Sequence, residues 1–344
     1  MNISIASEQD RNAWDVFVIN CPNSTIYHLI RWKDIIEKSY GHSTYYLIAE
    51  ENNAIVGILP LVFISNYLMG NSLTSLPFVN YGGFCTNNLI AQKILLEEAI
   101  VLAKKLRVKY IEFRQMRELS EFSLPAKKEK VTLLLEFPST EDILWKQLDP
   151  NVRNHIRKAT RSDLTFKLGG KELLHDFYSV FSQNMHDLGS PVHSRTFFEQ
   201  IFYAFPELTK IAGIFFGPHM IGSAILFTFK EYIEVPWASS LRKYRQYCPN
   251  NLLYWELLKF GCEQKFRYFD FGRSTVNSGT YKFKTQWGAK PTQLYWYYYL
   301  SGTQHVPLSL GQSKKMQFIS YIWKRTPVKI TQKIGPMIRK YISA

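Results

Sequence analysis

Two stretches of this chain read alike, and this internal repeat restricts the fold more than any single motif does. Residues 43–65 hold two apolar, β-branched runs separated by the polar EENNA, and residues 209–229 hold two more around GPHM. Such paired runs predict β-hairpins. A segment with apolar residues at helical spacing precedes each hairpin, WKDIIEKSYG in the first half and RTFFEQIFYAF in the second.

The order of elements after each hairpin is repeated as well. A further strand, a helix and another strand follow in both halves, so that the first ends in YIEFRQ and the second in YFDFGR. We therefore expect an α/β fold of the α+β mixed-sheet kind, duplicated in tandem, with helices on both faces of each sheet. The expected domains are 1–150 and 151–305, joined near 127–163 and followed by a basic tail over 306–344.

Charge is distributed unevenly along the 344 residues. Residues 1–150 hold 15 Lys and Arg against 17 Asp and Glu, residues 151–305 hold 19 against 11, and residues 306–344 hold eight against none. A basic second half predicts an anionic partner there, which could be phosphate, nucleic acid or an acidic lipid surface. Charge alone does not choose among these three.

The tail over 306–344 intersperses its cations with Phe318, Ile319, Tyr321, Ile322 and Trp323. One interpretation is an interfacial helix on an anionic membrane, because basic faces with Trp and Ile opposite bind lipid headgroups. The other is a helix packed on the body of the protein with a solvated basic face. The sequence leaves both open.

Several classes of protein are excluded by missing patterns. There is no signal-peptide pattern and no run of 18 apolar residues, so we expect a cytoplasmic protein. The four cysteines, Cys21, Cys85, Cys248 and Cys262, lack metal-ligand spacing, and we expect reduced, mostly buried thiols and no metal site. The chain also lacks the GxSxG, P-loop, GxGxxG and protein-kinase motifs.

A basic helix is predicted just after the expected linker. Arg153, Arg157 and Arg161 recur every four residues and therefore share a face, with Lys158 beside them and Asp149 or Asn151 as the N-cap. A row of guanidinium groups suits successive phosphates. An ordinary solvated helix face is the alternative.

The strand YIEVPWASS is interrupted by Pro236, which marks an edge or a bulge because proline cannot donate a ladder hydrogen bond. A bulge that separates two strands would expose backbone N–H groups to a substrate carbonyl beside Trp237. Arg242 and Arg245 then precede a helix expected to begin near Asn250, and a helix N-terminus attracts phosphate.

Two further stretches carry candidate polar groups. A loop is expected to contain Asp187 and His193. The stretch FDFGRSTVNSGTYKFKTQWG ends a strand at Gly272 and is then expected to form a loop that brings Phe283 and Lys284 back across the strand ends. Asp270 and Arg273 flank Gly272 and could be a structural ion pair.

These motifs together resemble a known family. The runs IVGILPLVFI, SLPFVNYGGF and IEFR in the first half, with VRNHIRKATR, GSPVHSRTFFEQI, FDFGRS and GTYKFKTQWGAKP in the second, are similar to the Fem family of peptidyl- and acyltransferases. More narrowly, they resemble FemAB-related proteins associated with exosortase and PEP-CTERM systems in bacteria that export polysaccharide. The likeness runs through nearly the whole chain.

The resemblance implies tandem GNAT domains and transfer of an acyl or aminoacyl group to an amine of a cell-envelope or exopolysaccharide precursor. The donor is acyl-CoA or aminoacyl-tRNA, with no permanently bound cofactor, and the acceptor is an anionic sugar nucleotide or a lipid-linked precursor. Contact with tRNA and peripheral contact of 306–344 with the inner membrane are the other expected interactions. By resemblance, Phe283 and Lys284, with Tyr281 nearby, fall on the acyl channel, and Arg153, Arg157 and Lys158 on the phosphate-handling region.

The reaction we expect is direct attack of an amine on an activated ester or thioester. Lys284 would stabilise the developing oxyanion, and Asp270 or Asp187 would position or deprotonate the amine. The expected donor contacts are Arg242, Arg245 and Asn250, and the expected substrate contacts include Arg273, Pro236 and Trp237. The rival interpretation is a non-catalytic module that holds an anionic glycan or lipid-linked precursor at the membrane.

Overall fold

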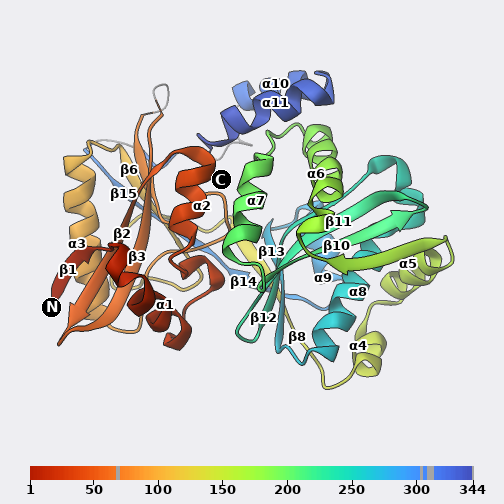
Figure 1. Ribbon diagram of the computed structural model, residues 1–344, viewed down its shortest axis with the longest axis horizontal. Coiled ribbons are helices and arrows are strands. Elements are labelled where there is room, and N and C mark those ends of the chain that lie inside the picture. The colour runs from red at the N-terminus through yellow and green to blue at the C-terminus, as the bar shows by residue number, and fades with distance from the viewer. Residues whose placement is uncertain (67–69, 303–304, 308–313, 343–344) are drawn as a thin grey trace. The chain divides into compact units, whose positions relative to one another are not determined.

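The computed structural model describes residues 1–66, 70–302, 305–307 and 314–342, except for the side chains of residues 314–317. The chain forms two compact units (Figure 1). The first unit comprises residues 1–129, 293–308 and 340–344, and the second comprises residues 130–292 and 309–339.

The first unit is built on a mixed sheet with strand order β1-β2-β3-β4-β6-β15-β7, and β5 pairs with β3. Helix α3 (Leu89–Lys105) packs on one face through the apolar cluster that it forms with β2 and β3, and α1 (Arg11–Asn20) and α2 (Trp32–Tyr40) cover the other. The strands are β1 (Asn2–Ile5), β2 (Ser43–Glu51), β3 (Ala54–Ile64), β4 (Ser72–Thr74), β5 (Cys85–Thr86), β6 (Tyr110–Gln115), β7 (Ala126–Lys127) and β15 (Tyr295–Leu300).

The second unit has a mixed sheet with strand order β14-β8-β13-β12-β11-β10-β9. Its strands are β8 (Lys130–Glu136), β9 (Leu164–Gly169), β10 (Thr209–Phe216), β11 (His219–Phe229), β12 (Tyr232–Ser240), β13 (Tyr268–Thr275) and β14 (Lys290–Gln293). Its helices are α4 (Glu141–Gln147), α5 (Pro150–Thr160), α6 (Leu174–Leu188), α7 (Arg195–Ala204), α8 (Pro249–Glu263), α9 (Gly279–Thr285), α10 (Lys314–Trp323) and α11 (Val328–Arg339), with the short 3-10 helix η4 (Arg242–Tyr247) before α8.

The strands occupy equivalent positions in the two sheets. Read from the β1 edge and from the β9 edge, each passes through antiparallel neighbours to one parallel pair, β4 with β6 in the first unit and β12 with β13 in the second. The predicted duplication, the two hairpins and the mixed α/β class are thus confirmed.

The units do not follow the expected ranges 1–150 and 151–305. Strand β8 pairs with β13, so residues from Lys130 onward belong to the second unit. Strand β15 returns to pair with β6, so residues 293–308 belong to the first unit. In each case a strand distant along the chain completes the sheet beside the inner strand of the parallel pair.

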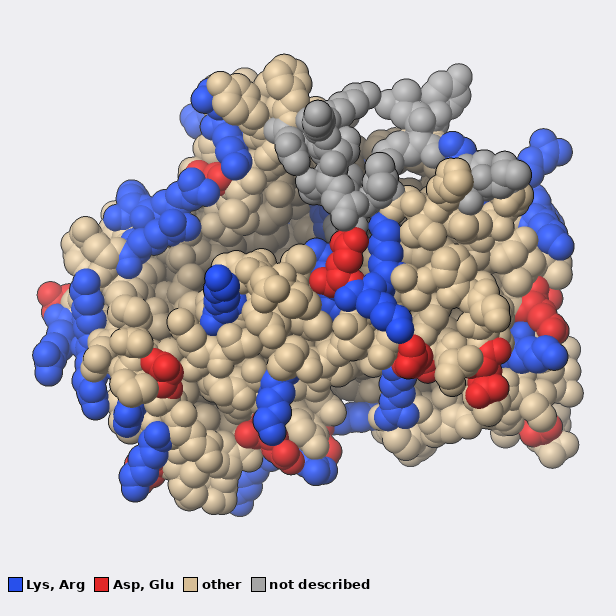
Figure 2. Space-filling model, turned by 180° about the vertical axis from the view of Figure 1, so that it is seen from behind, with Lys and Arg blue, Asp and Glu red and all other residues tan. Residues whose placement is uncertain are grey.

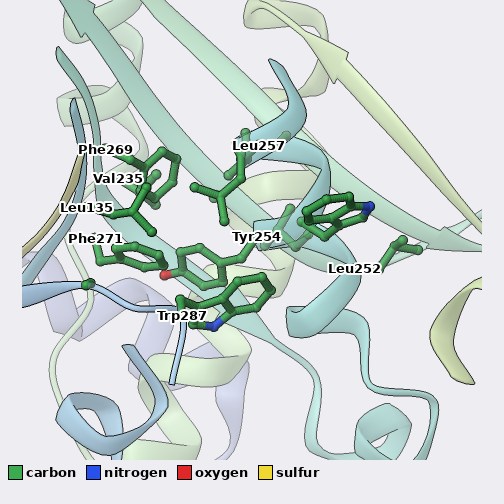
Figure 3. Close-up of a cluster of buried hydrophobic side chains, with 14 of the residues drawn as sticks. Leu135, Val235, Leu252, Tyr254, Leu257, Phe269, Phe271 and Trp287 are labelled. Atoms are coloured by element: carbon green, nitrogen blue, oxygen red, sulfur yellow. The ribbon is translucent and has the colours of Figure 1, made fainter. Parts of the chain in front are cut away.

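The core of the second unit lies where α5 and α8 pack on the sheet. Tyr254 of α8 stacks on Phe271 of β13 with ring centroids 5.2 Å apart, and Trp287 lies 6.0 Å from Tyr254 (Figure 3). All three side chains are buried, and Trp287 is 1% exposed. Burying such aromatic rings stabilises a fold by several kcal/mol, on the order of 2 to 3 kcal/mol for each ring. This core therefore fixes α8 and the segment after α9 against β13.

Two segments differ from the sequence prediction. GTYKFK is a helix, α9, and not a loop, because the hydroxyl of Ser278 caps it by accepting a hydrogen bond from the Tyr281 N–H at 3.2 Å. Asp187 is not in a loop but in the last turn of α6, which continues to Leu188 and ends at Gly189 with φ of +75°.

Two β-bulges lie side by side in the second sheet. On β12, Ile225 pairs with Trp237 and Phe227 with Glu234, so that two β12 residues, Val235 and Pro236, stand opposite one β11 residue. Of the two alternatives predicted at Pro236, an edge or a bulge, the structure shows the bulge. On β13, Asp270 pairs with Leu134 and Arg273 with Thr132, so that Phe271 and Gly272 oppose one residue of β8. Gly272 has φ of +74°, a conformation that L side chains rarely adopt.

The β13 bulge predicts an unequal response at two glycines. Gly272→Ala should lower the free energy of unfolding by at least about 1 kcal/mol, because a side chain at positive φ is strained. Gly279→Ala is the matched control, since a Cβ there meets no atom within 4 Å and the position is helical. Urea denaturation of both variants measures the difference, and equal stabilities would show that the bulge does not need glycine.

Candidate functional site

An opening between β12 and β13 begins beside the two bulges. The strands are paired in parallel from Tyr232 with Tyr268 to Glu234 with Asp270, and this pairing ends there although β12 continues to Ser240 and β13 to Thr275. Beyond Glu234, the edge of β12 that faces β13 therefore has no strand partner within the described residues. Unpaired strand edges present backbone N–H and C=O groups to a ligand.

Asp270 lies at the base of this opening and is 2% exposed. Its Oδ1 accepts hydrogen bonds from the Gly272 N–H at 2.7 Å and from the Thr132 hydroxyl of β8. Two donors on one carboxylate oxygen hold the side chain in a fixed orientation. Asp270 thereby fixes the β13 bulge and places a carboxylate where the strands diverge.

Lys284 reaches the same bulge from α9. Its Nζ donates hydrogen bonds to the backbone carbonyl oxygens of Gly272 at 2.8 Å and Arg273 at 3.1 Å. The side chain is 8% exposed, and burial lowers the pKa of Lys284 to about 8. The negative charges of Asp270 and Glu234 partly oppose this shift, and the positive charge of Arg273 adds to it. Lys284 can therefore exist in both protonation states near neutral pH.

The rest of α9 anchors this lysine in the core. Phe283 packs on Tyr254 at 5.5 Å and on Trp287 at 6.0 Å between ring centroids, and Tyr281 is half-buried against the same cluster. Side chains one residue apart on a helix point about 100° away from each other. Packing Phe283 into the core thus directs Lys284 toward β13.

Glu234 is a buried carboxylate that the sequence analysis did not select. It is 6% exposed and is the direct neighbour of Asp270 in the parallel register, so both carboxylates lie on the same face of the sheet. A signal was available, because an ionisable residue between Ile233 and Val235 in an apolar strand is rarely buried without a role. Two carboxylates and one lysine thus meet beside the opening.

The N-terminus of α8 offers few free amides. Cys248 precedes it with φ of +54°, Pro249 has no N–H, and the Asn251 N–H already donates to the Cys248 carbonyl at 3.0 Å. The side chains near this N-terminus are better candidates for contacts with a ligand. Asn250 Oδ1 is buried without a hydrogen-bond partner in the described part of the chain, and Arg245 is exposed.

Lys158 of α5 also lies near this N-terminus. Burial raises the pKa of the Cys248 thiol, and the positive charge of Lys158 opposes that shift. Lys158 is itself exposed. Lys158 and Arg245 are therefore two exposed cations near the start of α8.

The other residues of the basic row lie on a different side of α5. Arg157 and Arg161 line a cavity of about 350 Å³ between α4, α5 and α8, in which the Arg157 guanidinium lies 5.4 Å from the ring centre of Trp145. Glu141 and Asp142 line the same cavity. Arg153 is half-buried, with an Nε that has no partner among the described residues. The predicted N-cap, Asp149, is confirmed by its 2.8 Å hydrogen bond from the Asn151 N–H.

Asp187 and Arg242 contact each other. The Arg242 Nη2 donates to the Asp187 carbonyl oxygen at 2.8 Å, and its Nε lies 3.6 Å from a carboxylate oxygen of Asp187. The same carboxylate accepts a hydrogen bond from Gln183 at 2.9 Å. These contacts join α6 to η4 and account for the position of both side chains.

Trp237, the residue after the β12 bulge, packs among aromatic rings of α7. Its ring centroid lies 5.2 Å from Phe198 and 5.8 Å from Phe197. His193 stacks on Phe197 and is 2% exposed, and burial holds the pKa of this imidazole well below its usual value. Pro236 is half-buried. The catalytic and substrate-binding roles predicted from the sequence stay predictions at all these positions.

On the face shown in Figure 2, Lys and Arg side chains are more widespread than Asp and Glu. No group of three or more His, Cys, Asp or Glu that could hold a metal occurs in the described residues. Cys21 and Cys85 are buried, Cys248 and Cys262 are half-buried, and all four are free thiols.

Comparison with known proteins identifies the fold. Residues 147–285 match the family described as acetyltransferase (GNAT) domain, and this range includes β9 to β13, α8 and α9 of the second unit. No curated protein matches the sequence. The expected FemAB-related, GNAT-type fold is confirmed by this match and by the solved structures below, whereas the PEP-CTERM subgroup stays a prediction.

Three solved structures are similar over most of the chain. FemX has a TM-score of 0.68 at 15% identity, covering 86% of this chain and 97% of its own. A tandem GNAT protein from the clavulanic acid biosynthesis pathway has a TM-score of 0.56 at 9% identity, covering 88% and 99%. The C-terminal domain of a putative lysylphosphatidylglycerol synthetase from Agrobacterium fabrum has a TM-score of 0.56 at 11% identity, covering 84% and 92%.

The lowered pKa of Lys284 predicts a pH-dependent stability. Between pH 8 and about 10.5 the unfolded chain holds a proton at this side chain that the folded chain has released, so rising pH favours folding. The free energy of unfolding of the wild type, relative to Lys284→Met, should therefore rise over this window by up to about 3 kcal/mol. Lys282→Met, at an exposed lysine of the same helix, is the control. A constant difference across this range would contradict the lowered pKa.

Proposed function

We propose that this chain is an acyltransferase that moves an acyl or aminoacyl group from an activated donor to an acceptor amine at the opening between β12 and β13. The observation that carries this proposal is the diverging strand pair, with the buried Lys284 and two buried carboxylates beside it. The GNAT match over 147–285 supports the reaction class, because it includes both strands and α9.

In the proposed chemistry, a carboxylate acts as the base, and Lys284 acts as the oxyanion donor and then as the acid. The acceptor amine attacks the carbonyl carbon of the donor ester or thioester, a C–N bond forms, and Asp270 or Glu234 takes the proton released by the amine. Lys284 in its protonated form stabilises the oxyanion and then gives a proton to the leaving oxygen or sulfur as the bond to the acyl carbon breaks. A pKa of about 8 suits this exchange, since the ammonium form predominates at neutral pH and yet releases its proton readily.

The donor we favour is aminoacyl-tRNA. Free backbone N–H groups at a helix N-terminus favour binding of a pyrophosphate such as that of CoA. At the start of α8, Pro249 supplies none and the Asn251 N–H is already engaged. The exposed side chains Arg245 and Lys158 suit separate phosphates of a nucleic acid better. We therefore assign them, with Arg242 and Asn250, to the nucleotide end of the donor.

The acceptor we propose is an amine on an anionic sugar nucleotide or a lipid-linked precursor of the cell envelope or an exopolysaccharide. The resemblance to PEP-CTERM-associated proteins and the basic second half of the chain support it. Such precursors would meet the protein in the cytoplasm. Arg153, Arg157 and Arg273 are the candidate contacts for its phosphates, and Phe283, Tyr281, Pro236 and Trp237 are the candidate lining of the channel.

Replacing Lys284 tests the catalytic role. Lys284→Met should lower kcat by about 10²- to 10³-fold, the usual cost of losing an oxyanion donor, with little change in donor affinity. Lys282→Met, on the exposed face of α9, should keep the wild-type rate. Single-turnover transfer and donor binding by filter assay measure the two quantities. Unchanged transfer by Lys284→Met would refute this role, and binding without any transfer by the wild type would favour a non-catalytic module.

The donor can be identified by thermal stabilisation. Aminoacyl-tRNA should raise the melting temperature of the wild type, and Arg245→Ala combined with Lys158→Ala should abolish most of the shift, because phosphate contacts dominate affinity for RNA. Acetyl-CoA at the same concentration should give no shift. Stabilisation by acetyl-CoA alone would reject the assignment to tRNA.

A further inference from the structure

The two C-terminal helices expose an unusual amount of apolar surface. Nine large apolar side chains in 318–341 are between 38% and 64% exposed. Phe318 and Met337, at 64% each, are among the most exposed apolar residues of the described chain. Eight of the nine, on α10 and α11, form what we call the tail apolar face: Phe318, Ile319, Tyr321, Ile322, Ile330, Ile334, Met337 and Ile338.

Helix α11 packs on the rest of the second unit through small and polar residues, and not through these apolar side chains. Thr331 and Gly335 of α11 are buried, and a Cβ on Gly335 would lie only 2.9 Å from Val192 Cγ1. Gln332 Nε2 donates to the Ser182 hydroxyl of α6 at 2.7 Å. Figure 1 shows α10 and α11 beside α6 and α7.

Two further polar contacts hold the two ends of α11. His186 Nε2 lies 2.8 Å from the carbonyl oxygen of Thr326, and Arg339 Nε donates to His193 Nε2 at 3.1 Å. A helix that packs on a protein normally turns its large apolar residues inward. Here they point outward, so attachment to α6 does not account for them.

The outward residues of α11 form a regular stripe. Ile330, Ile334, Met337 and Ile338 follow one another at helical spacing, and each continues one side of the same helix. A second stripe runs beside it and is basic, made of Lys329 and Lys333. Apolar and basic stripes side by side characterise helices that lie in a membrane interface.

Charge identifies the kind of membrane. Residues 306–344 hold eight Lys and Arg and no Asp or Glu, so this segment is attracted to anionic surfaces. A nucleic acid would bind the cations, but it would leave Ile334, Met337 and Ile338 exposed to water. An anionic bilayer accepts both stripes, because phosphate groups meet the lysines while the apolar residues enter the acyl boundary.

We propose that the tail apolar face, with its flanking lysines, docks the protein on an anionic lipid bilayer. The described residues contain no helix long and apolar enough to cross a membrane, so docking would be peripheral. It requires no acyl transfer and stands or falls independently of the function proposed above. Lipid binding would hold α6 and its neighbour His193 close to the membrane surface.

Vesicle co-sedimentation of the full chain tests this docking. The wild type should bind phosphatidylglycerol vesicles and not phosphatidylcholine vesicles. Ile334→Ser combined with Met337→Ser should weaken binding by about 100-fold, or about tenfold for each lost apolar side chain. Lys329→Gln combined with Lys333→Gln should weaken it by about 25-fold, and added salt should reproduce part of this loss.

The controls separate docking from folding and from other partners. Ile19→Ser removes a similarly exposed isoleucine on α1, 58% exposed, and should leave binding unchanged. Each variant should keep the wild-type melting temperature, because all the altered side chains are exposed. Wild-type binding by the Ile334/Met337 variant, or no binding by the wild type, would overturn the proposal. So would a wild-type dimer that this variant converts to a monomer, since a second copy would then cover the face.

Discussion

The divergence of β12 from β13 is the constraint on which the candidate site depends. Both strands carry a bulge at the same level, one around Pro236 and one around Gly272, so parallel pairing stops at Glu234 and Asp270. The β13 bulge is stabilised by hydrogen bonds to side chains of β13 and α9. Asp270 accepts the Gly272 N–H, Lys284 donates to the carbonyls of the bulge, and Phe283 fixes α9 against Tyr254. The opening is thus a built feature of the second unit, held by hydrogen bonds and by core packing.

In the first unit, the same fold has no opening at the equivalent position. Its strand β4 is only three residues long and matches β12 in the sheet order, so no long strand can diverge there. Glu112 of β6 forms a 2.8 Å ion pair with Arg114, which is fully buried and lies 4.4 Å from the Trp296 ring. An acid and an arginine thus occur in both inner strands, in YIEFR and FDFGR, but only the second contains the glycine that allows a bulge. The duplication has left one unit with a satisfied ion pair and the other with a buried polar cluster beside the diverging strands.

Much of the fold could be predicted from the sequence, because hairpins, amphipathic helices and the irregularity at Pro236 depend on residues close together along the chain. The repeat gave the duplicated mixed sheet, and the proline gave the bulge. The features that were not predicted depend on residues far apart along the chain or on a single helix cap. The exchange of β8 and β15 between the units is set by pairing with β13 and β6, far along the chain. GTYKFK looked like a loop because Gly279 and Thr280 disfavour a helix, but the Ser278 cap and the burial of Phe283 outweigh that. Glu234 was overlooked because its importance lies in its neighbour Asp270 on another strand.

We propose that the acyl carbonyl of the donor lies between β12 and β13, and covalent capture tests this most directly. An aminoacyl-RNA analogue with a diazirine on its acyl group can be irradiated on the protein, and the modified residues identified by mass spectrometry. We predict that the label falls on residues 235–240 of β12, 271–275 of β13 or Lys284. A label confined to the first unit, or to the cavity between α4, α5 and α8, would contradict the account.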